Sequence, residues 1–313
     1  MKPKVTVKSM TMDAVLKWET TPYNLYIKLP DGRFLIVLRT GNAIDKDRLE
    51  KYAAKGVTTL FASEHDLSEM NASEIAPPDN AKMEALEKLS DAVFDELKSL
   101  GVTEASFNHA KAIGKAVRGM LEREPKLSAA FQKFQDLGRE DTRHSMMVSA
   151  LSTVLVSSMD WVKPATHENV AMGALLHDFG RFTLPSEILH ADPATLSVQD
   201  RKIFEGHAES GRALLAQVKS VPEDVMMIVA QHHERSDGSG YPLGLKDFYI
   251  HPLARVVGLA NELVEKYEVD RKAGRRTSIR ILIESLIGSQ ASKFNRDLIK
   301  SLRAMLDSDV LAK

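Results

Sequence analysis

Cysteine is absent from this sequence of 313 residues. Its absence excludes disulfides, thiolate-bound zinc and a cysteine nucleophile, and it permits a reducing compartment. No apolar run approaches the roughly 18 residues that a membrane helix needs, and residues 1–15 contain no apolar core of a signal peptide. We therefore expect a cytoplasmic protein without a membrane span.

The sequence also lacks an excess of charge of either sign. Its 42 lysines and arginines balance 43 aspartates and glutamates, and the formal net charge is -1. This balance gives no overall electrostatic reason to expect duplex nucleic acid or an anionic membrane as a partner. Any phosphate ligand must therefore be held by a local group of side chains.

The first part of the chain, residues 1–76, mixes strand and helix signals. Residues 23–29 and 33–38 are rich in β-prone side chains, and Pro30-Asp31-Gly32 between them predicts a turn and hence a hairpin. Asp45 can cap a short helix that follows. No cluster of ligand side chains is visible here, so we expect a small α/β domain with a packing, regulatory or partner-binding role.

Helical patterns dominate the rest of the chain. Pro77-Pro78 marks a boundary because the residue before a proline is pushed out of helical conformation. Apolar residues at spacings of three and four then predict two connecting helices within residues 77–125. Strand signals are scarce over residues 126–313, which predicts a helical bundle. The expected fold is therefore mainly α, with a C-terminal helical bundle and a small N-terminal α/β domain.

Ten histidines are present, and they fall into two sets. Five of them have no carboxylate or histidine partner at helical spacing, which favours ordinary hydrogen-bonded roles in the core or at the surface. These are His65, His109, His167, His190 and His251. In the other set, His144 follows Glu140 by four residues, so both side chains lie on one face of a helix.

Two further pairs of ligand-type residues stand at predicted helix ends. His177 and Asp178 are adjacent, and Gly180 is expected to end their helix. His232 and His233 close another predicted helix directly before a loop that is rich in glycine. The glycines would allow the backbone of this loop to approach a ligand closely.

The remaining member of the set, His207, is expected inside a helix. Ser197 and Asp200 form a capping-box signal at the start of that helix, which is predicted to run through His207 to Leu214. Buried imidazoles and carboxylates are costly unless they are paired or coordinated, so several helices that each direct such a group inward favour a metal site over simple packing. The candidate ligands are His144, His177, Asp178, His207, His232 and His233.

The chemistry of these ligands limits which metals are expected to bind. Imidazole and carboxylate without thiolate suit iron, manganese or zinc. Six ligands are too many for one ion with an open position, so at least two ions are expected. Asp178 has two carboxylate oxygens and could bridge them at the separation of roughly 3.5 to 4 Å that is typical of two-metal sites.

Three sequence motifs carry a resemblance to a known family. They are HDFGRFTLPSEIL from His177, FEGHAESG from Phe204 and HHERSDGSGYPLGL from His232. In this order and spacing they resemble the HD-GYP proteins, a branch of the HD metal-dependent phosphohydrolases that hydrolyses the bacterial messenger cyclic di-GMP. The resemblance is close over residues 140–261 and weaker beyond them. It implies an HD-type helical bundle.

The resemblance places the family's metal ligands on the six residues named above and adds others. Glu140 matches a glutamate that helps to hold a third metal in some members, and Asn261 stands where the family has an aspartate ligand. Arg181 and Arg271 are expected to contact phosphate. The motif that gives the family its name falls on Gly240, Tyr241 and Pro242. The loop from Asp237 to this motif would line the substrate pocket or dock a signalling protein partner.

Several positions depart from the family pattern. Asn261 brings no negative charge, which would weaken one metal position. Val264 replaces a second aspartate of the same segment, and Ala273 stands where a tyrosine is usual. Arg181 replaces a lysine, so it keeps the positive charge but cannot release a proton near neutral pH.

The function that the resemblance implies is phosphodiester hydrolysis. The substrate would be cyclic di-GMP, the product pGpG and/or GMP, and the nucleophile a hydroxide that bridges two metal ions. Asp178 and Arg181 would form the catalytic centre, with iron favoured over manganese and zinc and a third ion left open. Two alternatives remain: a metal-containing cyclic dinucleotide receptor or adaptor without useful turnover, and an HD hydrolase that acts on another nucleotide.

Overall fold

The computed structural model describes most of the chain. The described residues are 5–6, 8–28, 34–54, 57–63, 75–76, 79–123, 134, 137–159, 162–275 and 277–307. The chain divides into two compact units, Met1–Leu86 and Glu87–Lys313, and the division falls within one helix. The domain boundaries expected at residues 76 and 125 stay predictions.

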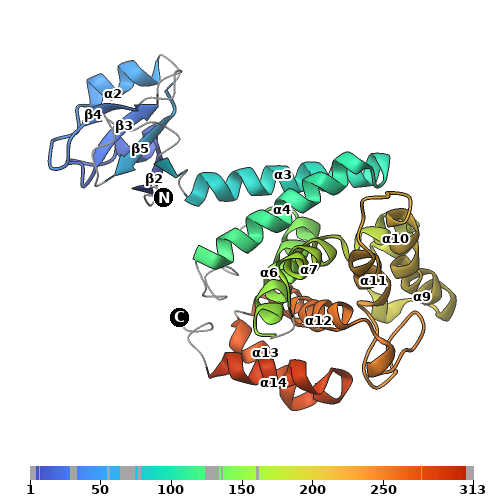
Figure 1. Cartoon of the computed structure of the whole chain (residues 1–313). Coiled ribbons are helices and arrows are strands. Elements are labelled where there is room, and N and C mark those ends of the chain that lie inside the picture. Colours follow the sequence, from blue (N-terminus) through green and yellow to red (C-terminus); the bar gives the residue numbers. More distant parts are fainter. Residues whose placement is uncertain are drawn as a thin grey trace. The chain divides into compact units, whose positions relative to one another are not determined.

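The first unit is a small antiparallel sheet with short helices (Figure 1). Four strands pair in the order β2-β5-β3-β4, and a separate parallel pair joins β1 to β6. The elements are β1 (Val5–Thr6), β2 (Lys8–Thr11), α1 (Met12–Val15), β3 (Asn24–Lys28), β4 (Phe34–Leu38), α2 (Lys46–Ala53), β5 (Thr59–Ser63) and β6 (Ile75–Ala76).

Most of the predicted features of this unit are present. Strands β3 and β4 form the expected antiparallel hairpin. The Asp45 carboxylate caps α2 by accepting a hydrogen bond from the Arg48 N–H at 3.0 Å. Leu25, Leu49 and Leu60 are fully buried in its core. The turn at residues 30–32, the Pro77-Pro78 boundary and His65 lie outside the described residues.

The second unit is a bundle of helices (Figure 1). Its α-helices are α3 (Asp79–Leu100), which contains the division, α4 (Glu104–Arg123), α6 (Glu140–Ser157), α7 (Pro164–Leu176), α8 (Ser186–Leu189), α9 (Val198–Glu205), α10 (His207–Leu215), α11 (Glu223–Gln231), α12 (Pro252–Lys272), α13 (Ile279–Ser289) and α14 (Arg296–Leu306). Short 3-10 helices lie at η1 (Phe179–Thr183), η2 (Pro193–Thr195), η3 (Asp247–Tyr249) and η4 (Ala291–Lys293). The expectation of a mainly α chain with a small N-terminal sheet is confirmed.

Helices α6, α7, α11 and α12 form the centre of the second unit (Figure 1). Helix α6 packs against α7 and α12, and α11 packs against the same two helices. Met146 of α6 is fully buried on one side of the helix and Met147 and Leu151 on another, because other helices surround it. This arrangement brings residues near the ends of α7 and α11 close to side chains of α6 and α12.

The structure has two helices, α9 and α10, where the sequence predicted one. The expected N-cap is present, since Ser197 Oγ accepts a hydrogen bond from Asp200 N at 3.1 Å, but α9 ends at Glu205 and α10 begins at His207. His207 therefore lies at a helix start and not inside a helix, and the expectation was wrong. The break at Gly206 allows the His207 ring to fold back onto the Phe204 carbonyl, which is described below.

No helix in the described part of the chain has the length and apolar character needed to cross a membrane.

Candidate metal centre

Three histidines share one local geometry at helix ends. His177 caps the C-terminus of α7, His232 caps that of α11, and His207 follows the Gly206 cap of α9. In each case ring Nδ1 lies at hydrogen-bond distance from the carbonyl oxygen three residues earlier. The distances are 2.7 Å from His177 to Ala174, 2.7 Å from His207 to Phe204 and 2.8 Å from His232 to Val229.

These hydrogen bonds fix the tautomer of the three rings. A carbonyl oxygen can only accept, so Nδ1 must carry the proton and Nε2 is left with a free lone pair. Such a hydrogen bond from the second ring nitrogen is how metal-ligating histidines are normally oriented. The helix ends of this sequence therefore produce three imidazoles that are prepared to act as ligands through Nε2.

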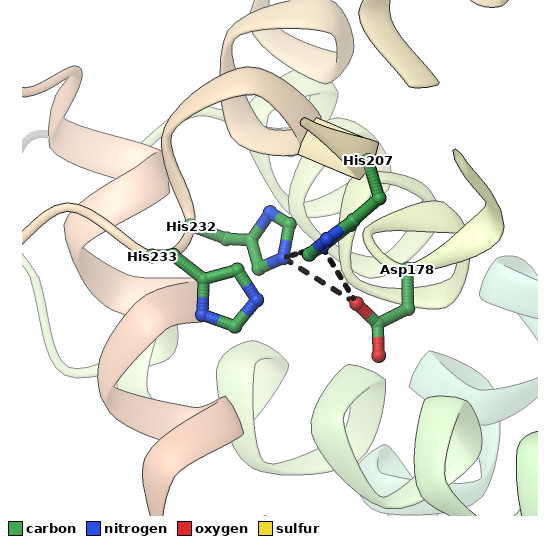
Figure 2. Close-up of side chains that lie close together, drawn as sticks. All are labelled: Asp178, His207, His232 and His233. Atoms are coloured by element: carbon green, nitrogen blue, oxygen red, sulfur yellow. Dashed lines mark hydrogen bonds and ion pairs between the residues drawn. The ribbon is translucent and has the colours of Figure 1, made fainter. Parts of the chain in front are cut away.

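The free nitrogens of these rings converge on Asp178, and Figure 2 shows this for His207 and His232. His207 Nε2 and His232 Nε2 lie 3.3 and 3.5 Å from Asp178 Oδ1, and His177 Nε2 lies 3.7 Å from Oδ2. The two carboxylate oxygens thus face different imidazoles. Asp178 belongs to two groups of potential ligands whose atoms lie within 4.8 Å of one another: Asp178 with His207, His232 and His233, and Asp178 with His144 and His177.

Burial favours the neutral form of four imidazoles, those of His144, His177, His232 and His233. Desolvation is the main reason that the pKa of His232 falls to about 4 and that of His144 to about 3, and it also lowers the pKa values of His177 and His233. Neutral imidazoles offer lone pairs near neutral pH, as a metal requires.

Asp178 is ionised despite its surroundings. Burial by itself would raise the pKa of Asp178, but interactions that include the positive Arg181 guanidinium outweigh it, and the pKa lies well below the ordinary value. Arg181 Nη1 lies 3.0 Å from Asp178 Oδ2. The site therefore combines one negative carboxylate with uncharged nitrogen donors.

The side chains present fit a bound cation. His207 Nε2 and His232 Nε2 lie 3.5 Å apart, and both are lone-pair atoms, so they repel each other unless a cation lies between them and Asp178. Two buried oxygens, Asp178 Oδ1 and Asn261 Oδ1, have no hydrogen-bond partner in the described part of the chain. Unsatisfied acceptors of this kind are costly in a protein interior, and metal coordination would satisfy them.

The glycine-rich loop is anchored beside the ligands. Glu234 is buried, and its two carboxylate oxygens accept hydrogen bonds from Leu243 N at 2.8 Å and Leu245 N at 2.7 Å. A Cβ atom at Gly240 would clash with backbone atoms of His233 and Glu234, so glycine is needed for this close approach. Tyr241 stacks on the His233 ring at a centroid distance of 4.4 Å.

Gly180 of the HD-x-G sequence has a similar role in packing. A Cβ atom there would clash with the His207 carbonyl oxygen and the Gly211 backbone. The absence of a side chain lets η1 lie directly against α10, and this contact brings Asp178 close to His207.

Several predicted site residues lie apart from the cluster. Glu140 is in neither ligand group, and its Oε1 lies 2.6 Å from Lys272 Nζ. Arg271 is exposed near the C-terminal end of α12. Asp237 accepts hydrogen bonds from Ser239 within its own turn, and Pro242 is exposed. Their predicted roles stay predictions.

The described histidines that were expected to have ordinary core or surface roles lie outside the cluster. Neither ligand group in the described residues includes His109, His167, His190 or His251. His109 Nδ1 lies 3.4 Å from a Glu96 carboxylate oxygen, and His251 Nε2 lies 3.4 Å from one of Asp224.

One residue beside the site did not emerge from the sequence. Glu265 lies one helical turn after Asn261 on α12, and Asn261 Nδ2 donates a hydrogen bond to its Oε1 at 2.9 Å. Solvent reaches the Glu265 side chain, yet desolvation by the surrounding protein, with repulsion from Asp178 and Glu262, raises its pKa to about 7. The spacing of four from Asn261 was the available signal, the same spacing that relates Glu140 to His144.

This fold and cluster define a helical protein with a group of histidines and an aspartate that could bind metal. Residues 117–297, more than half of the chain, match the HD domain family, and the chain belongs to that family. The expected family is confirmed, and the motif Gly240-Tyr241-Pro242 agrees with its HD-GYP branch. The HD domain supplies the metal-dependent framework on which the cluster is built.

Relatives of this chain include named phosphodiesterases. It is 28% identical over 148 residues to a cyclic di-GMP phosphodiesterase of Pseudomonas aeruginosa, a match that covers 47% of this chain and 35% of that protein. It is 32% identical over 123 residues to a cyclic di-GMP phosphodiesterase of Thermotoga maritima, covering 39% of this chain and 33% of the relative. A third relative, 3'3'-cGAMP-specific phosphodiesterase 1 of Vibrio cholerae, is 31% identical over 121 residues. This match covers 38% of this chain and 27% of the relative. The match therefore spans about a third of the length of these relatives.

A solved structure has a similar fold. The HDG"Y"P protein of Bdellovibrio bacteriovorus superimposes with a TM-score of 0.56 and 19% sequence identity, covering 96% of this chain and all of that one. At this identity the likeness concerns the fold.

Proposed function

We propose that this protein is a metal-dependent phosphodiesterase that hydrolyses cyclic di-GMP to pGpG and/or GMP. The observation that carries the proposal is the position of Asp178 between two groups of ligands, with Oδ1 facing His207 and His232 and Oδ2 facing His177. A carboxylate shared in this way suits a pair of metal ions. The named relatives support the choice of substrate.

The two ions would be held by separate halves of the cluster. His207, His232 and His233 would hold one, His144, His177 and Asn261 would hold the other, and Asp178 would be shared. Nitrogen and carboxylate donors without thiolate favour iron, with manganese or zinc as alternatives. Metal ions there would activate water for attack on phosphorus and offset the charge of the phosphate oxygens.

The protein's own residues organise this reaction. Arg181 holds Asp178 Oδ2 at 3.0 Å and keeps the carboxylate directed into the cluster. The Arg181 side chain is 34% exposed, so N–H groups that Asp178 does not occupy would be available to a phosphate. Tyr241 shields the outer face of His233 by stacking on it.

Conversion of cyclic di-GMP tests the proposal directly. Anaerobically prepared protein loaded with Fe²⁺ or Mn²⁺ is incubated with the dinucleotide, and the products are separated by chromatography. We expect pGpG and/or GMP from the wild type and none from Asp178→Asn. Tight binding without product would instead support a metal-containing receptor, a reading favoured by Asn261 and by the engagement of Arg181 with Asp178.

A second substrate belongs in the same experiment. One of the relatives above is named for 3'3'-cGAMP. If only 3'3'-cGAMP is hydrolysed, the proposed substrate is wrong but the proposed metal-dependent phosphodiester hydrolysis is retained. The cytoplasmic location, the third metal and a protein partner at the loop from Asp237 to Pro242 stay predictions.

A further inference from the structure

Asn261 stands where a negatively charged ligand is expected, and its amide has a fixed orientation. The side chain is fully buried on α12. Its Nδ2 donates a hydrogen bond to Glu265 Oε1 at 2.9 Å. Because the NH₂ group faces Glu265, the carbonyl oxygen of the Asn261 amide faces the other way.

The other side of the Asn261 amide faces the metal centre. Asn261 interacts with the imidazole of His144, which belongs to the same ligand group as His177 and Asp178. Asn261 Oδ1 is buried and has no hydrogen-bond partner in the part of the chain that the structure describes. The oxygen therefore lies beside the His144 imidazole, where a cation held by that imidazole would satisfy it.

Glu265 is also close enough to the centre to act on it electrostatically. Its carboxylate interacts with Asp178, with the Arg181 guanidinium and with Tyr241. Glu262 lies near it on the same helix and repels it. A solvent-accessible glutamate that is repelled by two carboxylates could turn away into water, yet here it is bonded to Asn261 beside the ligands. Positive charge in the cluster would explain this placement.

We propose that Glu265 is a positioning residue of the metal centre, which turns the Asn261 carbonyl oxygen toward the ion held with His144 and His177 and restores the negative charge that asparagine lacks. This inference rests on the metal pair of the proposed function. It explains how the site tolerates asparagine in place of an aspartate ligand: the charge has moved one helical turn along α12.

A swap of the two side chains tests the proposal. Glu265→Gln removes the charge and offers the Asn261 amide a second amide, so the orientation is no longer fixed. The double variant Asn261→Asp/Glu265→Gln exchanges the two roles. The carboxylate at position 261 becomes the charged ligand, and the amide at position 265 donates the hydrogen bond that holds it. Each full-length protein is stripped of metal and titrated with Mn²⁺ by calorimetry, and retained metal is measured by elemental analysis.

We expect Glu265→Gln to weaken Mn²⁺ binding at one of two sites by about tenfold, the size typical for loss of an outer partner of a ligand. The double variant should return to the wild-type affinity. The matched control is Glu284→Gln, which removes the same charge from an exposed position of α13 and should change nothing. Circular dichroism verifies folding of each variant.

Two results would overturn the proposal: Glu265→Gln binding Mn²⁺ as the wild type does, or the double variant binding no better than Glu265→Gln alone. These results concern metal affinity, whereas the proposed function is tested by product formation, so the two failures can be told apart. A wild type that binds Mn²⁺ at two sites without hydrolysing cyclic di-GMP would contradict only the latter.

Discussion

Arg143 and Glu268 form a buried ion pair that joins α6 to α12 beside the metal centre. Arg143 Nε lies 2.8 Å from Glu268 Oε1, Nη2 lies 3.3 Å from Oε2, and Nη1 donates to the Leu137 carbonyl oxygen at 2.9 Å. The two side chains are only 4% and 8% exposed. Arg143 directly precedes His144 in the sequence, so this pair holds a ligand-bearing part of α6 against the helix that carries Asn261.

Breaking this pair on one side should destabilise the protein strongly. Arg143→Met leaves the Glu268 carboxylate buried without its partner, a change that typically costs about 3–5 kcal/mol. The double variant Arg143→Met/Glu268→Leu removes both charges and should recover much of this loss. Urea denaturation measures both. The control Lys98→Met breaks the exposed pair with Asp141 and should cost at most about 1 kcal/mol. Equal costs for the buried and exposed variants would contradict this account.

The Glu234 carboxylate should control the opening of the glycine-rich loop. Its oxygens accept the Leu243 and Leu245 amide protons, and a hydrogen bond to a charged group contributes roughly 1.5–3 kcal/mol. In Glu234→Ala these two amides should exchange with deuterium at least tenfold faster than in the wild type. The exposed Asp237→Ala, which affects only the neighbouring Ser239, should leave them unchanged. Unchanged exchange in Glu234→Ala would show that the loop is held by other contacts.

Metal-free protein should lose stability on mild acidification. The folded pKa of His232, lowered to about 4 by burial, lies below the unfolded value of 6.5, so the unfolded chain binds more protons between these values. Stability is therefore full above pH 6.5 and is lost as the pH falls toward 4. His232 alone should cost about 2 kcal/mol between pH 7 and pH 5, and His144 acts in the same direction. Chemical denaturation of chelator-treated protein at both pH values measures the difference.

Bound metal should keep or strengthen this dependence, because an ion that occupies Nε2 keeps the proton off the folded protein while the unfolded chain still binds it. The metal-loaded protein at pH 7 and pH 5 serves as the comparison. A stability of the metal-free protein that is the same at pH 7 and pH 5 would mean that the buried imidazoles are already charged or are hydrated.

The sequence predicted which side chains come together, but not how they are arranged. Adjacent pairs such as His177-Asp178 and His232-His233 stand at predicted helix ends, and three motifs in order supported the family. The structure brings both pairs together with His144 and His207. Local patterns were sufficient here because each ligand is placed by the end or the face of a helix.

Other features depend on contacts that no local pattern records. The break at Gly206 was missed because the capping signal marks where a helix begins and not where it ends. Lys272 neutralises Glu140 across 132 residues of chain. Glu265 was overlooked although it stands four residues after Asn261, because its meaning depends on which side of α12 faces the ligands.

The central claim is that Asp178 is shared by two metal ions, and metal analysis of ligand variants after anaerobic purification tests it most directly. The wild type should contain about two ions per chain. His144→Ala and His233→Ala should each retain about one, because they remove a ligand from different groups, whereas Asp178→Ala should retain almost none. A folded wild type with no bound metal, or an Asp178→Ala variant that keeps both ions, would contradict the account.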